Sequence, residues 1–299
     1  MTLLGRWKTR FTPGVANGDG ANINVPAKRI DGTIVRPGQS FNFAGSVLPI
    51  TEPPYHLGGV LRNGQIIEDG VLGGGMCSAS TTLWNAAMRA GLTTVERHAH
   101  SIYISRYPVG LDATVLGTPT RGQNVVFAND TGNNIYIRGI PGRRRVIFEI
   151  YGIDDGRTVH LSEPRVENRR EAKIYMQYTD SLAPGEQDHV TDRYDGFQSW
   201  VTRTVRDANG NVIHSNTYQS TYRVLDGLIM VGRYAGDPVS GTRILAADYP
   251  GRPDPPDPTP RPSRTPRPPT PTPPPTPAPT PAPTPAPTPA PTPTPTPAA

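Results

Sequence analysis

Cysteine is almost absent from this sequence: among 299 residues it occurs once, at Cys77. A single cysteine excludes an internal disulfide, and its scarcity fits a cytosolic protein or an exported bacterial protein that avoids stray thiols. Long hydrophobic runs are absent too, so we predict no transmembrane segment, and the start shows no apolar stretch of a signal peptide. The net charge is only +5, which argues against nucleic acid as a partner.

Proline is scarce in the body of the sequence and abundant at its end. Of the 37 prolines, 25 lie from Pro250 to Pro297 and 12 lie before them. Repeats of Thr-Pro and Ala-Pro cannot bury apolar surface, so we expect residues 250–299 to form a disordered, extended polyproline tail. The body has ordinary globular composition, and its length suits one large or two small domains.

The pattern of residues divides the body into three parts. Residues 1–24 are rich in Gly, Asn and Thr and are expected to be an irregular lead-in. Residues 25–160 combine short strand-like segments with one helix-like segment, and residues 164–235 are almost wholly strand-like, with a hairpin signal at Asp207–Gly210. We therefore predict an α+β fold in which one principal helix packs on a β-sheet, followed by a small all-β module.

The helix is expected over residues 78–90. Four apolar positions recur there at helical spacing: Ala79, Leu83, Ala86 or Ala87, and Ala90. Gly91 suits a left-handed C-terminal cap. Because small residues dominate the face, the helix is expected to pack closely against a sheet.

Cys77 follows three glycines, Gly73–Gly75, at the expected start of that helix. A helix N-terminus lowers the pKa of a thiol by stabilising the thiolate, and the amides of a glycine-rich turn can receive an oxyanion. The arrangement is typical of a cysteine nucleophile. The alternative is that the glycines allow a close backbone approach and that Cys77 is a small buried apolar residue. The residue types alone leave both interpretations open.

Two histidines and a carboxylate follow the cysteine. His98 and His100 would share one face of a strand continuing into residues 101–107, so that one serves as base for Cys77 and the other as a second donor. Asp112 could orient an imidazole as the third member of a triad. The alternatives are a polar turn and an ordinary loop carboxylate. All four residues are also metal-ligand types, but their spacing matches no zinc motif, so we predict no metal site and no cofactor.

Four segments, in order, resemble hallmarks of the VanW-like family: Asp31–Phe43 (DGT…PGQSFNF), Gly73–Ala87 (GGGMCSASTTLWNAA), Arg97–Ser101 (RHAHS) and Gly110–Val115 (GLDATV). The resemblance covers residues 8–140, and Ser78 stands where the family commonly has Gln. It implies that five residues occupy the family's marked positions: Gly75, Cys77, His100, Ser101 and Asp112. It also implies a bacterial envelope protein, without implying a settled reaction. Members often carry an N-terminal membrane anchor, and a truncated or misassigned start would explain its absence here.

The second module resembles a G5-type β module through four segments: Tyr178–Leu182, Asp195–Phe197, Ser220–Tyr222 and Ile229–Gly232. Such modules recur in surface proteins that meet N-acetylated sugars or biofilm polymers. The resemblance implies a context that faces the cell wall and identifies no binding residues.

Together these patterns predict an extracellular or envelope-associated protein whose partner is peptidoglycan or another cell-wall polymer. In one interpretation, an imidazole deprotonates the thiol, and hydrolysis or transpeptidation of an amide follows. The residues expected to act are Cys77, His100, His98 and Asp112 for catalysis, with Gly75, Ser78 and Ser101 for oxyanion binding or positioning. In the other, the groove near the thiol is a non-catalytic binding site for wall polymer, and the second module adds avidity.

Overall fold

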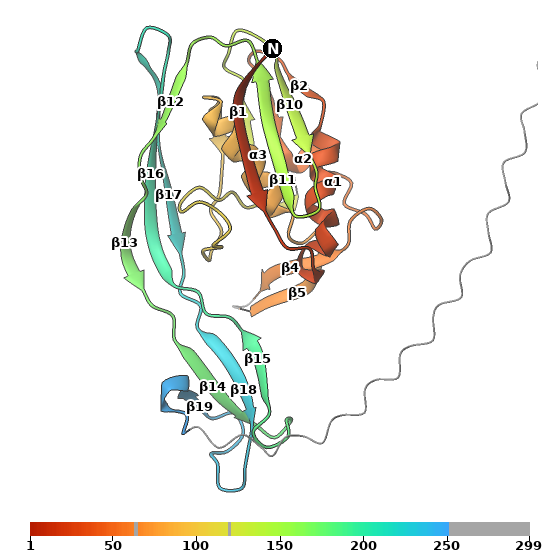
Figure 1. Cartoon of the computed structure of the whole chain (residues 1–299), viewed down its shortest axis with the longest axis vertical. Helices are drawn as coiled ribbons and strands as arrows, with labels where there is room; N and C mark the ends of the chain where they lie inside the picture. Colours follow the sequence, from red (N-terminus) through yellow and green to blue (C-terminus); the bar gives the residue numbers. More distant parts are fainter. Residues whose placement is uncertain (63–64, 119–120, 251–299) are drawn as a thin grey trace, which may run out of the picture. The chain divides into compact units, whose positions relative to one another are not determined.

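The structure, a computed structural model, describes residues 1–62, 65–118 and 121–250 (Figure 1). Apart from its first residue, the tail predicted for residues 250–299 lies outside this part. Strands dominate the described residues and are joined by a few helices, so the predicted α+β class is confirmed. None of these helices combines the length and the apolar character that crossing a membrane would need.

A four-stranded antiparallel sheet organises the first domain. Its order is β1-β11-β10-β2, formed by Thr2–Arg10, Arg145–Gly152, Ile135–Ile140 and Thr33–Val35. The expected irregular lead-in is therefore wrong for β1, in which Trp7 lies opposite Phe148 of β11. The two residues that β1 buries are Gly5 and Thr9, and neither has a large apolar side chain. Its sequence consequently lacks the apolar alternation that would have predicted a strand.

Helix α3 (Cys77–Arg89) is the predicted principal helix, and it packs on β1 and β11. The close packing expected from its small residues is confirmed, because a Cβ on Gly5 of β1 would lie 2.3 Å from the Ala86 carbonyl oxygen. Gly91 has φ +82°, which is the left-handed cap that the sequence predicted. The amide of Leu92 donates to the Ala87 carbonyl at 3.2 Å and closes the C-terminal turn.

A second helix, α1 (Ala21–Ile30), also lies against the sheet (Figure 1). It approaches β10 closely, since a Cβ on Gly139 would lie 2.1 Å from the Ala27 carbonyl oxygen. The other elements of this domain are a short 3-10 helix, a one-turn helix α2, a three-stranded sheet β3-β9-β6 and two hairpins, β4-β5 and β7-β8. The helices are the 3-10 helix Val15–Gly20 and α2 (Phe43–Ser46). The three-stranded sheet consists of β3 (Ser40–Asn42), β9 (Val126–Ala128) and β6 (Thr93–Glu96). The hairpins consist of β4 (Leu57–Arg62) with β5 (Gln65–Leu72) and of β7 (Leu116–Thr118) with β8 (Arg121–Gln123).

Two further sheets form the C-terminal module. In the first, β16 pairs with β12, β13 and β17; in the second, the order is β15-β18-β14-β19, with β14 and β18 parallel. The first comprises Thr158–Leu161 (β12), Arg165–Arg170 (β13), Gly196–Arg206 (β16) and Val212–Tyr222 (β17). The second comprises Ile174–Thr179 (β14), Gln187–Thr191 (β15), Gly227–Gly232 (β18) and Arg243–Leu245 (β19), and a 3-10 turn, Ala246–Asp248, follows. The hairpin predicted around Asp207–Gly210 is confirmed as β16-β17.

The β16-β17 hairpin packs on helix α3 and shares its hydrophobic core. The ring of Tyr218 meets Trp84 edge-on with centroids 4.9 Å apart. The fully buried Arg203 donates from Nη1 to the carbonyls of Met88 and Leu92, at 3.1 and 2.9 Å. A cation at a helix C-terminus is favoured by the helix dipole. These contacts hold the C-terminal module against the domain that carries the single cysteine.

Candidate active site

The glycine turn before α3 is shaped by close backbone contacts. Gly75 has φ +85°, and a Cβ there would lie 2.6 Å from the Ala16 carbonyl oxygen. A Cβ on Gly74 would lie 2.2 Å from the Gly58 carbonyl carbon. Glycine is therefore required at both positions, and the turn delivers Cys77 to the first residue of the helix.

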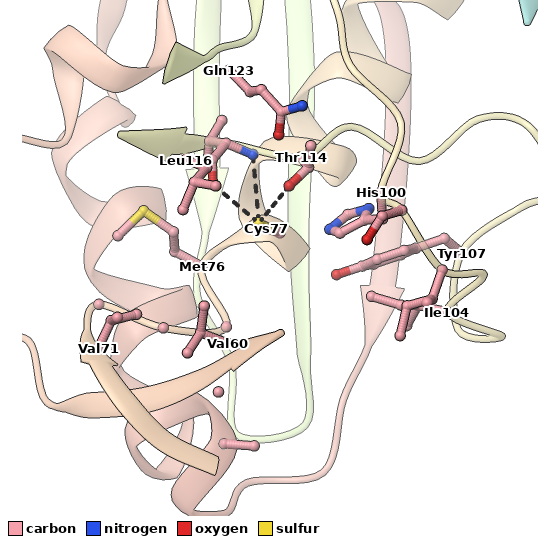
Figure 2. Close-up of a pocket in the computed structure, with 18 of the residues that line it drawn as sticks. Val60, Val71, Met76, Cys77, His100, Ile104, Tyr107, Thr114, Leu116 and Gln123 are labelled. Carbon is pink, nitrogen blue, oxygen red and sulfur yellow. Dashed lines mark hydrogen bonds between the residues drawn. The ribbon is translucent and has the colours of Figure 1, made fainter. Parts of the chain in front are cut away.

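The thiol of Cys77 has polar neighbours and is not buried among aliphatic groups. Its Sγ lies 3.5 Å from Thr114 Oγ1 and accepts a hydrogen bond from the Val115 amide at 3.5 Å. The His100 imidazole faces the same sulfur (Figure 2). Of the two interpretations that the sequence left open, these contacts favour a functional thiol over a buried apolar residue.

Asp112 holds His100 in that orientation. His100 Nδ1 and Asp112 Oδ2 lie 2.6 Å apart, and the His100 amide donates to the same oxygen at 2.6 Å. With Nδ1 bound to the carboxylate, Nε2 is the ring nitrogen left for the sulfur. The ring also stacks on Tyr107, with centroids 5.5 Å apart. Thiol, imidazole and carboxylate thus follow one another in the order of a nucleophile, a base and an orienting group.

The charges of this group reinforce one another. Burial raises the pKa of the Cys77 thiol, but hydrogen bonding to His100 and its charge, with help from Thr114 and Val115, bring it down to about 7. Burial lowers the pKa of His100, but Asp112 and then Cys77 raise it to about 9. Between these values the thiol is a thiolate and the imidazole is an imidazolium. The site therefore holds a thiolate and an imidazolium together near neutral pH.

Asp112 remains a carboxylate because of its partners. Burial raises its pKa, but hydrogen bonding to His100, the charge of His100 and the charge of Arg97 lower it below the ordinary value. Arg97 Nη2 donates to Asp112 Oδ1 at 3.0 Å, and the side chains of this pair are only 4% and 3% exposed. The Tyr222 hydroxyl donates to the same oxygen at 2.5 Å. Sequence reasoning missed Arg97, Thr114 and Tyr222.

The other predicted site residues lie differently. His98 is half-buried and pairs with Glu96 at 3.0 Å, so the structure does not bring it into the group around Cys77. The strand expected over residues 101–107 is wrong, because this segment is an irregular loop. The two histidines therefore do not share a strand face, and each has its own carboxylate. Ser101 lines the pocket, and its carbonyl accepts the Arg223 amide at 2.7 Å.

Ser78 does not offer its hydroxyl to the pocket. Ser78 Oγ lies 3.0 Å from the hydroxyl of Tyr107, the residue that stacks on His100. Among the amides expected to receive an oxyanion, those of Met76 and Ser78 donate to turn carbonyls at 3.3 Å. Within the described residues, the amides of Gly75 and Cys77 have no such acceptor. These two amides of the turn therefore remain available to another acceptor.

The thiol opens into a pocket of about 1050 Å³. Apolar side chains including Val60, Val71 and Met76 form one wall, and Ile104 and Tyr107 lie across from them (Figure 2). The C-terminal module contributes to the lining with β15 and the residues after it, at positions 189–192 and 194, and with residue 221. In the described part of the chain, no group of three or more His, Cys, Asp or Glu residues could hold a metal ion.

Parts of this chain are similar to known proteins. Residues 19–151 match the family model described as "VanW like protein". "Uncharacterized protein YoaR" of Bacillus subtilis (strain 168) is 34% identical over 134 residues, which cover 44% of this chain and 43% of that protein. "Vancomycin B-type resistance protein VanW" of Enterococcus faecalis (strain ATCC 700802 / V583) is 29% identical over 102 residues, 31% of this chain and 36% of that protein. The chain thus spans less than half the length of these relatives.

Among solved structures, the crystal structure of HP0197-G5 is similar to part of this chain. It is 18% identical, and the match covers 25% of this chain and 97% of that one, with a TM-score of 0.15. A score this low carries no argument, so the G5-like character of the C-terminal module stays a prediction.

Proposed function

This chain contains a domain of the VanW-like family, as its sequence motifs predicted, and from that premise we propose that it is a cell-envelope enzyme with a cysteine nucleophile. Its substrate is an amide of the peptidoglycan stem peptide, which it hydrolyses or transfers to an amine. One observation carries the proposal: Cys77 at the start of α3 faces His100, and Asp112 holds that imidazole at 2.6 Å.

The first half of the reaction forms a thioester. The Cys77 thiolate attacks the amide carbonyl carbon, the C–S bond forms, and the carbonyl electrons move to oxygen, where the amides of Gly75 and Cys77 receive the negative charge. The intermediate then collapses and the C–N bond breaks. His100 Nε2 gives its proton to the departing amine. Asp112 stays ionised and keeps the imidazolium oriented.

The second half releases the acyl group. A water molecule or an amine attacks the thioester carbonyl carbon and gives a proton to His100 Nε2. The C–S bond breaks and the thiolate re-forms beside the imidazolium. Water gives hydrolysis, and an amine of a second stem peptide gives transpeptidation. The pocket of about 1050 Å³ is large enough to seat a peptide segment on both sides of the sulfur.

A wall substrate is supported by the context of the domain. The name of the Enterococcus faecalis relative connects that protein with vancomycin resistance. We propose that the C-terminal module is G5-like and binds wall glycan, and that the protein is extracellular or envelope-associated. The competing function is a non-catalytic wall binder, in which the same pocket holds the polymer without cleaving it.

Reaction with purified muropeptides tests the proposal. The full chain is incubated with a mixture of monomeric and cross-linked muropeptides, and mass spectrometry follows the products and the intact protein. We expect new muropeptides and, after acid quenching, a covalent acyl adduct on Cys77; the Cys77→Ala variant should give neither. Co-sedimentation of both proteins with sacculi, without any muropeptide change, would identify a binder and refute the enzyme.

A further inference from the structure

Strand β17 of the C-terminal module places a row of hydroxyl groups against the first domain. Tyr218, Ser220 and Tyr222 alternate along the strand, and all three are buried. The Tyr218 hydroxyl lies 2.9 Å from Thr94 Oγ1. Ser220 Oγ lies 3.0 Å from Arg97 Nη2, and the Tyr222 hydroxyl lies 2.5 Å from Asp112 Oδ1. The end of this strand therefore reaches the carboxylate that orients His100.

Asp112 receives four hydrogen bonds, two at each carboxylate oxygen. His100 supplies both donors to Oδ2, through its amide and Nδ1, each at 2.6 Å. Arg97 and Tyr222 supply the two donors to Oδ1, at 3.0 and 2.5 Å. A carboxylate with both oxygens occupied in this way cannot turn without breaking a bond. Tyr222 is the donor among these that comes from the other module.

Tyr222 is itself fixed in place. Its hydroxyl accepts the Gly110 amide at 3.1 Å, and its ring packs on Phe197 and Tyr103 with centroids 4.9 and 5.5 Å apart. Burial and the neighbouring Asp112 raise its pKa far above the ordinary value, so the hydroxyl keeps its proton. The next residue, Arg223, donates its amide to the Ser101 carbonyl at 2.7 Å, beside His100.

We propose that Tyr222 is a positioning residue of the active site: its hydroxyl holds Asp112 so that the carboxylate keeps His100 directed at Cys77. The inference rests on the proposed function, because it assigns a role within that site. It makes the C-terminal module a part of the catalytic machinery as well as a wall of the pocket.

The chemistry distinguishes positioning from a simple electrostatic effect. Without the hydroxyl, Asp112 Oδ1 keeps only Arg97, and the carboxylate can rotate away from His100 Nδ1. The imidazolium then spends less time beside the sulfur, and the pKa of the Cys77 thiol rises. If the hydroxyl only withdrew charge from Asp112, its removal would make the carboxylate more basic. The carboxylate would then stabilise the His100 imidazolium more strongly, and the pKa of the Cys77 thiol would fall instead.

Alkylation of the single thiol measures this directly. The full chain and its Tyr222→Phe variant are treated with iodoacetamide from pH 5 to 10, and intact mass gives the rate at each pH. Tyr218→Phe is the matched control, because it removes a buried hydroxyl from the same face of the same strand, where the partner is Thr94. We expect Tyr222→Phe to slow alkylation near pH 7.5 on the order of tenfold, because a smaller fraction of the thiol is ionised once its midpoint has risen.

The outcomes separate this inference from the proposed function. A rise in the thiol midpoint for Tyr222→Phe, with Tyr218→Phe matching the unaltered protein, supports positioning. Equal shifts in the two variants, no shift, or a lower midpoint in Tyr222→Phe would overturn it. An ordinary thiol midpoint in the unaltered protein would instead count against the proposed function. Circular dichroism of both variants shows that each is folded when it is assayed.

Discussion

Replacement of His100 by glutamine should abolish the unusual acidity of the thiol. Burial alone raises the pKa of Cys77, and His100 provides the largest opposing effects, which bring the pKa from the ordinary 9.0 to about 7. Without the imidazole we expect a midpoint at or above the ordinary value. A change from about 7 to 9 corresponds to ~2.7 kcal/mol of lost preference for the thiolate.

The assay is iodoacetamide alkylation, since every modified thiol must be Cys77. At pH 7.5 the thiolate fraction would decrease from about 75% to about 3%, so alkylation of His100→Gln should be about 25-fold slower. Above pH 10 the order should reverse, because the nucleophilicity of a thiolate increases with its pKa. The two rate profiles should therefore cross.

His98→Gln is the matched control for this experiment. It removes an imidazole two residues away whose partner is Glu96, so its profile should coincide with that of the unaltered protein. Coincident profiles for His100→Gln and the unaltered protein would refute the argument that His100 activates the thiol. If only His98→Gln shifted the alkylation midpoint of Cys77, His98 and not His100 would be the histidine that activates the thiol.

Two further substitutions test the supports of the site. Asp112→Asn should raise the alkylation midpoint of the Cys77 thiol, because Asp112 raises the pKa of His100. It should also lower the free energy of unfolding by ~3–5 kcal/mol, because the buried Arg97 loses its ion partner. Alkylation profiles and urea titrations that match those of the unaltered protein would contradict this prediction. Both Gly75 and Gly32 have positive φ, but only at Gly75 would an added Cβ meet a carbonyl oxygen, at 2.6 Å. The free energy of unfolding measured in urea should therefore be ~1–3 kcal/mol lower for Gly75→Ala than for Gly32→Ala. Equal losses of unfolding free energy in the two variants would show that the backbone shifts to relieve the contact at Gly75.

The sequence predicted the principal helix, with Cys77 at its start, because both depend on local signals. Cys77 stands at a glycine turn, small residues recur at helical spacing, and Gly91 ends the helix. The hairpin around Asp207–Gly210 was predicted for the same reason, since its turn and its flanking strands are contiguous.

The sequence could not distinguish the two histidines, because the distinction depends on distant partners. His98 meets Glu96 and His100 meets Asp112, once the segment after them forms a loop and not a strand. The contact between Tyr222 and Asp112 joins residues 110 positions apart, and no local pattern marks it. Arg97 lies in the family-like segment Arg97–Ser101, but no pattern in the sequence indicated its ion pair with Asp112.

The N-terminal strand was missed for a different physical reason. Edge strand β1 exposes most of its residues, so only its pairing with β11 shows that it is a strand. Gly5, which weakens a strand prediction, is present because helix α3 approaches to within van der Waals contact there.

That pairing has a consequence for how the protein is made. A ribosome releases Thr2–Arg10 before the neighbour of this strand, Arg145–Gly152, which leaves the exit tunnel more than a hundred residues later. Helix α3 packs on both strands, so the nascent chain exposes Cys77 before Arg145–Gly152 has been made and the sheet can close. During that interval the helix that carries the sulfhydryl lacks the two strands on which it packs in the completed fold.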